Sequence, residues 1–199
     1  MANAGAGPLL VVITGPSGVG KDSLLARLKA LGRPYHFAVT ATTRPPRPGE
    51  IEGIDYYFLS DERFDEMLAG GEFLENATVY QHRYGVPKPP LREALAAGRD
   101  VVMRTDVQGA RYIKSVCPGA LTVFVQPPSR EELEWRLRSR GTDNPQQLEL
   151  RLRAAREELA AAGEFDHTVV NDDLNACVDA IERILAAERS RKGRQPVVV

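Results

Sequence analysis

Residues 9–28 read LLVVITGPSGVGKDSLLARL, and this stretch decides the fold. Its apolar beginning is typical of a buried strand, its glycines mark a loop, and the leucines after Lys21 are typical of a helix. A phosphate-binding loop requires this order of strand, glycine loop and helix. The glycines let successive backbone N–H groups surround an anion, and the helix N-terminus adds partial positive charge. A glycine-rich turn without a ligand is the alternative interpretation.

The loop predicts a nucleoside triphosphate as ligand. Lys21 is expected to reach the β- and γ-phosphates. Asp22 departs from the pattern, which places Ser or Thr after the lysine to hold Mg²⁺, and a serine follows only at Ser23. The residues expected to bind the triphosphate are Gly15, Pro16, Ser17, Gly18, Val19, Gly20, Lys21, Asp22 and Ser23.

The length and the net charge of the chain restrict the class of protein to which it can belong. The 199 residues suffice for one compact unit with a sizeable core. A formal net charge of −1 predicts neither nucleic acid nor a membrane surface as a partner. No apolar run approaches the roughly 20 residues that span a bilayer, and the N-terminal segment lacks the features of a signal peptide. Cys117 and Cys177 lack metal or redox spacing, so we expect a cytoplasmic α/β protein.

Short β-rich runs alternate with helical patterns. The runs are Leu9–Thr14, Tyr35–Thr40, Val101–Arg104, Leu121–Gln126 and His167–Val170. The expected helices are Asp22–Leu31, Val107–Val116, Ser129–Arg140, Gln146–Ala162 and Asp173–Glu188. This alternation predicts a parallel sheet covered on both faces, with ligands beyond the carboxyl ends of its strands. The residues expected to converge at those ends are Gly15, Thr40, Asp106 and Asn171.

Two segments interrupt the alternation. Residues 40–87 are proline-rich and then aromatic and strand-like, which predicts a small inserted lobe. Residues 129–163 predict two arginine-rich helices, the first capped by Ser129 with Glu132. The core then comprises residues 9–39, 88–128 and 164–188, and the tail 189–199 is expected to fray.

The segment TTRPPRPGE (residues 42–50) is a second candidate anion site. Its prolines restrict the backbone, so Arg44 and Arg47 are held with little entropy loss. A planar guanidinium can bind a phosphate bidentately. A solvated basic turn is the alternative, but the loop opens the inserted lobe directly after a strand of the nucleotide-binding sheet, which favours a phosphate.

With these residues in view, the chain resembles the guanylate kinases from about Leu9 to Glu188. Six segments match family motifs in the same order, which is far more specific than the glycine loop alone. They are Gly15–Lys21 (the P-loop), Thr42–Glu50 (the acceptor-phosphate loop), Tyr84-Gly85, Asp106-Val107-Gln108-Gly109, Pro127-Pro128-Ser129 with Arg136 and Arg140 (the lid), and Val170-Asn171-Asp172-Asp173 (the base-binding segment).

The resemblance implies a P-loop NTPase three-layer α/β fold spanning residues 9–188. A parallel five-stranded core sheet would carry a mixed GMP-binding lobe at residues 40–87 and a helical lid at residues 129–163. The implied reaction is ATP-dependent phosphoryl transfer to GMP, and to dGMP, giving GDP and ADP. Transfer would be direct and in line, assisted by Mg²⁺, the P-loop lysine and lid arginines.

The resemblance also assigns roles to individual residues. Those implied to bind GMP are Thr40, Arg44, Arg47, Glu50, Tyr56, Glu75, Tyr84 and Asp106. The carboxylates of Glu75 and Asp106 would accept from the guanine N1–H and 2-amino group. Adenine lacks these paired donors and would leave a carboxylate desolvated and unpaired. Glu50 is ambiguous, because it could serve only to brace Arg47.

The implied catalytic residues are Lys21, Arg44, Arg136, Arg140 and Arg151. The lid arginines would close over the transferring phosphoryl group, supplying positive charge and excluding water. The alternative is a charged helical face that pairs with Glu131, Glu134 and Glu158. Asn171 is implied to contact the ATP adenine, whereas Asp173 is explained as the N-cap of the last helix.

The chain departs from the family pattern at Asp22, Val86 and Arg104. Val86 replaces a Ser or Thr, so one hydroxyl contact to the base is expected to be missing. Arg104 stands where the family commonly has Asp, near the residue that follows the P-loop lysine. We hypothesise that Asp22 and Arg104 form an ion pair beside Mg²⁺, with Asp22 holding the metal directly or through water. A degraded metal site in a weak enzyme is the competing hypothesis.

Two other functions remain open at this point. A kinase of another phosphorylated small molecule, such as a ribose bisphosphate, can share the fold and the Lys-Asp-Ser sequence. An inactive scaffold module resembling the guanylate-kinase-like domains of membrane-associated adaptors is the third candidate. Those modules tend to lose the P-loop lysine, and this chain keeps Lys21.

Overall fold

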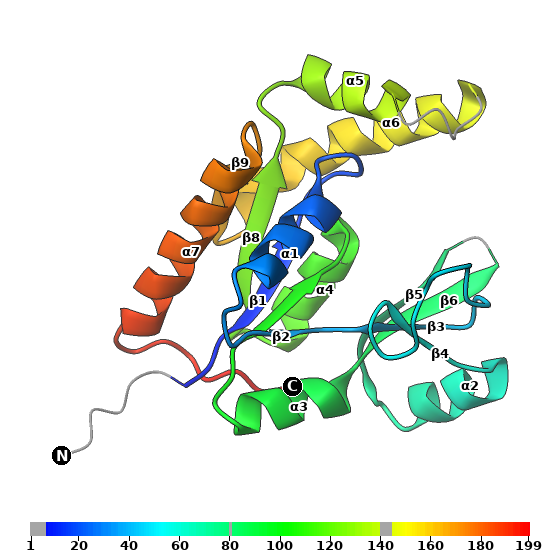
Figure 1. Ribbon diagram of the computed structural model, residues 1–199, viewed down its shortest axis with the longest axis vertical. Helices are drawn as coiled ribbons and strands as arrows, with labels where there is room; N and C mark the ends of the chain where they lie inside the picture. The colour runs from blue at the N-terminus through cyan, green and yellow to red at the C-terminus, as the bar shows by residue number, and fades with distance from the viewer. Residues whose placement is uncertain (1–6, 80, 140–144) are drawn as a thin grey trace.

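The computed structural model (Figure 1) describes residues 7–79, 81–139 and 145–199. Its core is a sheet of five parallel strands in the order β2-β7-β1-β8-β9. The strands are β1 (Leu10–Thr14), β2 (His36–Phe37), β7 (Val101–Arg104), β8 (Leu121–Gln126) and β9 (His167–Val170). The predicted parallel five-stranded sheet is confirmed.

Helices cover both faces of this sheet because successive side chains of a strand point to opposite sides. Val11 and Ile13 of β1 belong to one apolar cluster, to which α1 (Lys21–Ala30) and α7 (Leu174–Ser190) contribute. Leu10 and Val12 belong to a second cluster, with α3 (Lys88–Ala96) and α4 (Val107–Val116). Every residue of β1 is buried, which explains the apolar run of its first four residues. The result is the expected arrangement of helix, sheet and helix layers.

The inserted lobe is a separate mixed sheet in the order β4-β3-β6-β5. Its elements are β3 (Thr40–Thr42), β4 (Tyr56–Phe58), α2 (Asp61–Ala69), β5 (Phe73–Val79) and β6 (His82–Pro87). β3 and β4 are parallel, whereas β6 is antiparallel to β3 and to β5. A small apolar cluster that includes Phe64 of α2 stacked on Phe73 of β5 packs the helix on the sheet.

The segment predicted to form the lid contains α5 (Arg130–Ser139) and α6 (Pro145–Ala160), followed by a 3₁₀ turn (Ala161–Glu164). Ser129 Oγ accepts a hydrogen bond from the backbone N–H of Glu132 at 3.1 Å, which confirms the predicted cap of the first lid helix. Leu133, Leu137 and Leu152 join the same apolar cluster as α1 and α7, so the lid helices are packed on the core.

Locally, the structure differs from the sequence predictions. The run Tyr35–Thr40 is two strands in different sheets, since the chain leaves the core after Phe37 and enters the lobe at Thr40. The proline-rich segment after β6 begins α3, which the sequence did not predict. Prolines are tolerated in the first turn because its N–H groups have no intrahelical partner. Within the strand-like part of the lobe, β5 and β6 form an antiparallel hairpin.

The tail is packed against the core, whereas the sequence predicts fraying. Arg194 donates to the backbone carbonyls of Gly7 and Pro8. Arg92 Nε donates to the backbone oxygen of Val199 at 2.7 Å. Val197 also packs against the cluster that contains α3 and α4.

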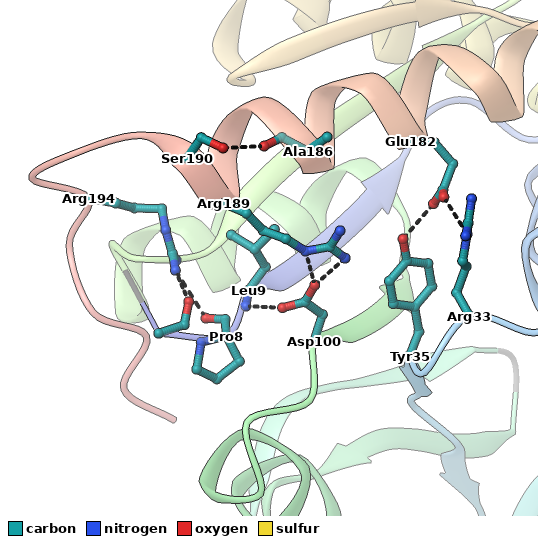
Figure 2. Close-up of polar contacts among 11 residues, drawn as sticks. Pro8, Leu9, Arg33, Tyr35, Asp100, Glu182, Ala186, Arg189, Ser190 and Arg194 are labelled. Carbon is teal, nitrogen blue, oxygen red and sulfur yellow. Dashed lines mark hydrogen bonds and ion pairs between the residues drawn. The ribbon is translucent and has the colours of Figure 1, made fainter. Parts of the chain in front are cut away.

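Polar side chains join α7 to the amino ends of the core strands (Figure 2). Asp100, which is only 8% exposed, accepts hydrogen bonds from the backbone N–H of Leu9 (2.7 Å) and from Arg189 Nε (2.6 Å). The Arg189 guanidinium lies over the ring of Tyr35, 5.4 Å from its centroid. The Tyr35 hydroxyl in turn donates to Glu182 Oε1 at 2.5 Å. This network fixes the last helix to the sheet.

Two further features are the state of the cysteines and the apolar character of the helices. Cys117 and Cys177 are free, buried thiols, and burial raises the pKa of Cys177 to about 11. Among the residues described, no helix combines the length and the apolar character needed to cross a bilayer.

We expect Asp100→Ala to lower the free energy of unfolding by about 2–4 kcal/mol, because it leaves the Leu9 N–H and the Arg189 guanidinium without their shared acceptor. Urea denaturation followed by circular dichroism measures the change. Arg33→Ala is the control, since Arg33 is 58% exposed where it pairs with Glu182, and its loss should cost less than about 1 kcal/mol. Equal effects of the two substitutions would contradict the role given to Asp100.

Candidate active site

The glycine loop between β1 and α1 leaves an open helix end. Gly20 caps α1 with φ 98°, a left-handed conformation that favours glycine, and no side chain caps the helix. The first backbone N–H groups of a helix lack intrahelical partners. Gly15 also needs to lack a side chain, because a Cβ there would lie 2.2 Å from the backbone oxygen of Val125. The loop therefore packs tightly on β8.

Lys21 is folded back onto this loop. Its Nζ donates to the backbone oxygens of Gly15 (2.5 Å) and Pro16 (3.0 Å). Burial lowers the pKa of Lys21, an effect that the nearby Glu158 carboxylate opposes and the Arg104 guanidinium reinforces. Desolvation of this ammonium strengthens its attraction for any anion that enters the site.

A cavity of about 340 Å³ separates the loop from the inserted lobe. Its lining joins residues that the sequence assigns to the two ligands. From the P-loop side come Gly15, Ser17, Gly18, Gly20, Lys21 and Asp22. From the acceptor side come Thr40, Tyr56, Glu75, Tyr84 and Asp106. Arg104, Thr105 and Glu158 also line this cavity, and the sequence assigned no ligand contact to Thr105 or Glu158.

Thr105 holds the predicted base-reading carboxylate in place. Its Oγ1 donates to Glu75 Oε1 at 3.2 Å. A Cβ on Gly109 would lie 2.2 Å from the same Oγ1, so the glycine makes room for this hydroxyl over the first turn of α4. Burial raises the pKa of Glu75, the Asp106 carboxylate adds to the shift, and the Thr105 hydrogen bond opposes it. Sequence reasoning missed Thr105, although it adjoins a recognised motif.

Asp106 has a structural role besides its predicted one. Its Oδ1 accepts from the backbone N–H of Gly109 at 2.7 Å and so caps α4. Asp106 also lines the cavity, and this bond does not use its Oδ2. In the Asp-x-Gln-Gly sequence, Asp106 is therefore the helix cap. Gly109 both donates the N–H to this cap and leaves room for the Thr105 hydroxyl.

The predicted pair between Asp22 and Arg104 is present. Arg104 Nε lies 2.8 Å from Asp22 Oδ1, and both side chains remain partly exposed at the cavity rim. No group of three or more His, Cys, Asp or Glu side chains within the described ranges could hold a metal by itself. Mg²⁺ that accompanies a nucleotide usually takes one or two carboxylates and otherwise phosphate oxygens and water. Asp22 fits such a cation, since its second carboxylate oxygen is not used by Arg104 Nε.

The loop of residues 42–50 is organised by Glu50. Arg44, which is buried, donates from both terminal nitrogens to the Glu50 carboxylate at 3.0 and 2.8 Å. The backbone N–H of Arg47 donates to the same carboxylate at 2.7 Å. These bonds lower the pKa of Glu50, with the Arg44 contribution the larger. Glu50 therefore braces Arg44 by its side chain and Arg47 only by its backbone.

This loop lies next to the cavity rather than in its wall. The Arg44 guanidinium is 5.3 Å from the ring centroid of Tyr56, which lines the cavity and contacts Tyr84 edge to face. The Arg47 side chain is exposed. Val86 is buried with the apolar residues around α3.

The lid arginines occupy different positions. Arg136 Nε donates to Glu132 at 2.8 Å, and its Nη1 donates to the backbone oxygen of Asn171 at 3.2 Å. Arg151 Nη2 donates to Ser17 Oγ of the P-loop at 2.9 Å. Arg140 lies outside the described residues.

Asn171 contacts the P-loop through a buried hydrogen bond. Its side chain is buried, and Nδ2 donates to the backbone oxygen of Val19 at 2.8 Å. A Cβ on Gly20 would lie 2.6 Å from this nitrogen, which adds a second reason for glycine there. The implied contact with adenine stays a prediction, for which Oδ1 is the remaining polar atom. Asp173 accepts from the N–H of Ala176 at 2.8 Å, which confirms its role as N-cap of α7.

Three predicted triphosphate residues contribute no cavity wall. Pro16 and Val19 are buried within the P-loop, and Ser23 is exposed on α1. A larger hollow of about 900 Å³ lies at the opposite ends of the core strands, and Tyr35 and Asp100 are among its lining residues. The polar side chains of the network in Figure 2 line it, and the glycine loop does not.

Comparisons with known proteins agree with this geometry. A family model described as guanylate kinase matches residues 8–188. A protein named guanylate kinase from Gloeobacter violaceus is 52% identical over 179 residues, which cover 90% of this chain and 87% of that protein. One from Carboxydothermus hydrogenoformans is 42% identical over 186 residues, covering 94% and 91%. The crystal structure of guanylate kinase from Anaplasma phagocytophilum is 32% identical, with a TM-score of 0.73 over 96% of this chain and 90% of that one.

The environment of Glu75 predicts a pH-dependent cost to stability. Because its pKa is raised in the folded state, the folded protein binds this proton more tightly than the unfolded chain does. Stability is therefore lost as the pH rises above the ordinary glutamate value of 4.5. We expect Glu75→Gln to be more stable than the parent chain at pH 7.5 and nearly equal to it at pH 4. Urea denaturation at both pH values measures this, and a difference independent of pH would contradict it.

Proposed function

The chain belongs to the guanylate kinase family, and on that premise we propose how its residues carry out ATP-dependent phosphorylation of GMP to GDP. The chain is a nucleoside monophosphate kinase. The observation that carries the assignment of residues is the shared cavity, in which the P-loop and Lys21 face Glu75 and Asp106 across about 340 Å³. A triphosphate on one wall and a monophosphate on the other would bring the reacting phosphates together.

The donor side is proposed to bind ATP through the P-loop. Backbone N–H groups at the start of α1 have no side-chain cap and suit the β- and γ-phosphate oxygens. Lys21 would exchange its two backbone acceptors for those phosphates. Asn171 would hold the loop in shape through Val19 while its remaining amide oxygen faces the adenine.

The acceptor side is proposed to read guanine through Glu75 and Asp106. Two carboxylates on one wall can accept from the N1–H and the 2-amino group, and adenine offers no such pair. Tyr56 and Tyr84 would donate to the GMP phosphate together with Arg44, whose guanidinium lies beside Tyr56. None of these assigned contacts involves the ribose 2′-hydroxyl, so we propose dGMP as a second acceptor.

The lid is proposed to complete the charge around the transferring group. Arg151 already reaches the P-loop at Ser17, whereas Arg136 would have to leave Glu132. Asp22 would hold Mg²⁺ directly or through water, with Arg104 fixing the carboxylate. The cation would supply charge neutralisation on the β- and γ-phosphate oxygens. Direct in-line transfer needs no protein nucleophile.

A coupled assay of ADP formation tests the acceptor. We expect turnover with GMP and dGMP and a kcat/KM for AMP or UMP at least about a thousandfold lower, because a buried carboxylate without its partner is costly. A ribose bisphosphate should give no ADP. Activity only with that compound would establish the alternative kinase, and absence of activity with every acceptor would favour a scaffold module.

A double-mutant cycle on Asp22 and Arg104 tests the pair. We expect Asp22→Ser and Arg104→Asp each to lower kcat/KM about tenfold and the double mutant to recover about 1 kcal/mol of the summed loss. Measurement over a range of Mg²⁺ concentrations reports whether the singles also weaken metal dependence. Strictly additive losses would contradict the pairing and favour independent defects at the metal site.

A further inference from the structure

Glu158 lies in the last turns of α6, yet its carboxylate lies at the P-loop. The backbone N–H of Ser17 donates to Glu158 Oε2 at 3.3 Å, and the side chain lines the same cavity as Lys21. The sequence placed this residue on a charged helical face that pairs with arginines. In the structure it is instead half-buried, and burial raises the pKa of its carboxyl group against the opposing effects of Ser17 and Lys21.

The contact is held by a packed helix rather than by a mobile side chain alone. Arg151 and Glu158 are seven residues apart, nearly two helical turns, so they share one face of α6. Arg151 donates to Ser17 Oγ while Glu158 accepts from Ser17 N–H, so the hydroxyl and the N–H of this P-loop residue both contact α6. Leu152 and Ala155, between them, are buried in the apolar cluster that contains α1. The core thus positions the carboxylate.

The Glu158 carboxylate accepts from a P-loop N–H group, as a bound phosphate oxygen would. P-loop N–H groups and the open end of α1 attract anions, and a carboxylate is the anion that a protein can supply itself. The Lys21 ammonium is close enough for Glu158 to affect its pKa. A triphosphate cannot use the Ser17 N–H while Glu158 occupies it, because one N–H group cannot serve both acceptors well.

We propose that Glu158 is an internal anion that occupies the donor-phosphate position of the P-loop in the empty enzyme and leaves when a triphosphate binds. The inference rests on the proposed function of the P-loop and not on the identity of the acceptor. Binding of the donor then breaks the contact between Glu158 and the Ser17 N–H. The glutamate lowers the affinity for the donor and links donor binding to release of the lid.

Calorimetric titration with sodium tripolyphosphate and with ATP, in EDTA and without acceptor, tests this competition. Glu158→Gln keeps the size of the side chain and removes its charge. We expect it to bind both ligands about tenfold more tightly, which corresponds to losing one charged hydrogen bond that competes with the ligand. Equal or weaker binding would overturn the proposal, since a residue that supports the phosphates would give that result.

Glu157→Gln is the matched control. It makes the same change of charge on the preceding residue, which is 72% exposed and pairs with Arg153. We expect its affinities to stay within twofold of the parent chain. Should Glu157→Gln tighten binding as much as Glu158→Gln, overall charge would explain the effect and the proposal would fail.

A second substitution protects the test against misfolding. Glu158→Asp keeps the charge but shortens the reach by one methylene group, so it should also bind tripolyphosphate more tightly than the parent chain. Thermal unfolding of every variant identifies a folding defect, and unchanged binding by a folded Glu158→Asp would count against the contact. Assaying the same samples with GMP separates the two hypotheses. Tighter tripolyphosphate binding without GMP turnover contradicts only the acceptor, and turnover without tighter binding contradicts only the role of Glu158.

Discussion

The open N-terminus of α1 is the constraint on which the rest of the site depends. A helix begins with N–H groups that have no intrahelical partner, and Gly20 provides no side chain to satisfy them. Placing this end beyond β1, in the middle of a parallel sheet, buries the helix on an apolar cluster while leaving its positive end accessible. Glu158, Arg151 and Asn171 all contact the loop that leads into this helix.

Acidic side chains outnumber basic ones in the lining of the cavity. Each of the carboxylates has a different hydrogen-bond or ion-pair partner. Glu75 accepts from Thr105, Asp106 caps α4, Asp22 pairs with Arg104, and Glu158 accepts from Ser17. Phosphoryl transfer requires the opposite balance around the reacting phosphates. In the function proposed above, this positive charge would come from Lys21, from Mg²⁺ that accompanies the nucleotide, and from Arg136 and Arg151, which here contact Glu132 and Ser17.

Sequence reasoning predicted the frame of the site well. The parallel sheet, the P-loop, the caps at Ser129 and Asp173, and the pair between Asp22 and Arg104 depend on local patterns or on motifs with known spatial relations. It failed where the outcome depends on packing between distant segments. Thr105 reaches Glu75 only because two sheets meet at α4, and the proline-rich start of α3 could be recognised as helical only once its apolar face had a partner.

The sequence by itself determined that this protein has a glycine loop between a strand and a helix, a parallel core sheet and an inserted lobe, because strand period and glycine spacing are local properties of the chain. The order of its motifs added the resemblance to the guanylate kinases. The tertiary structure decided which of the candidate groups share a cavity. In the folded chain Glu50 accepts from Arg44, and Asn171 donates to the Val19 carbonyl. Glu158 accepts from Ser17, which is 141 residues away in the sequence. Partners of this kind are chosen by packing and by the cost of leaving a half-buried polar group unsatisfied, and neither can be evaluated before the segments meet.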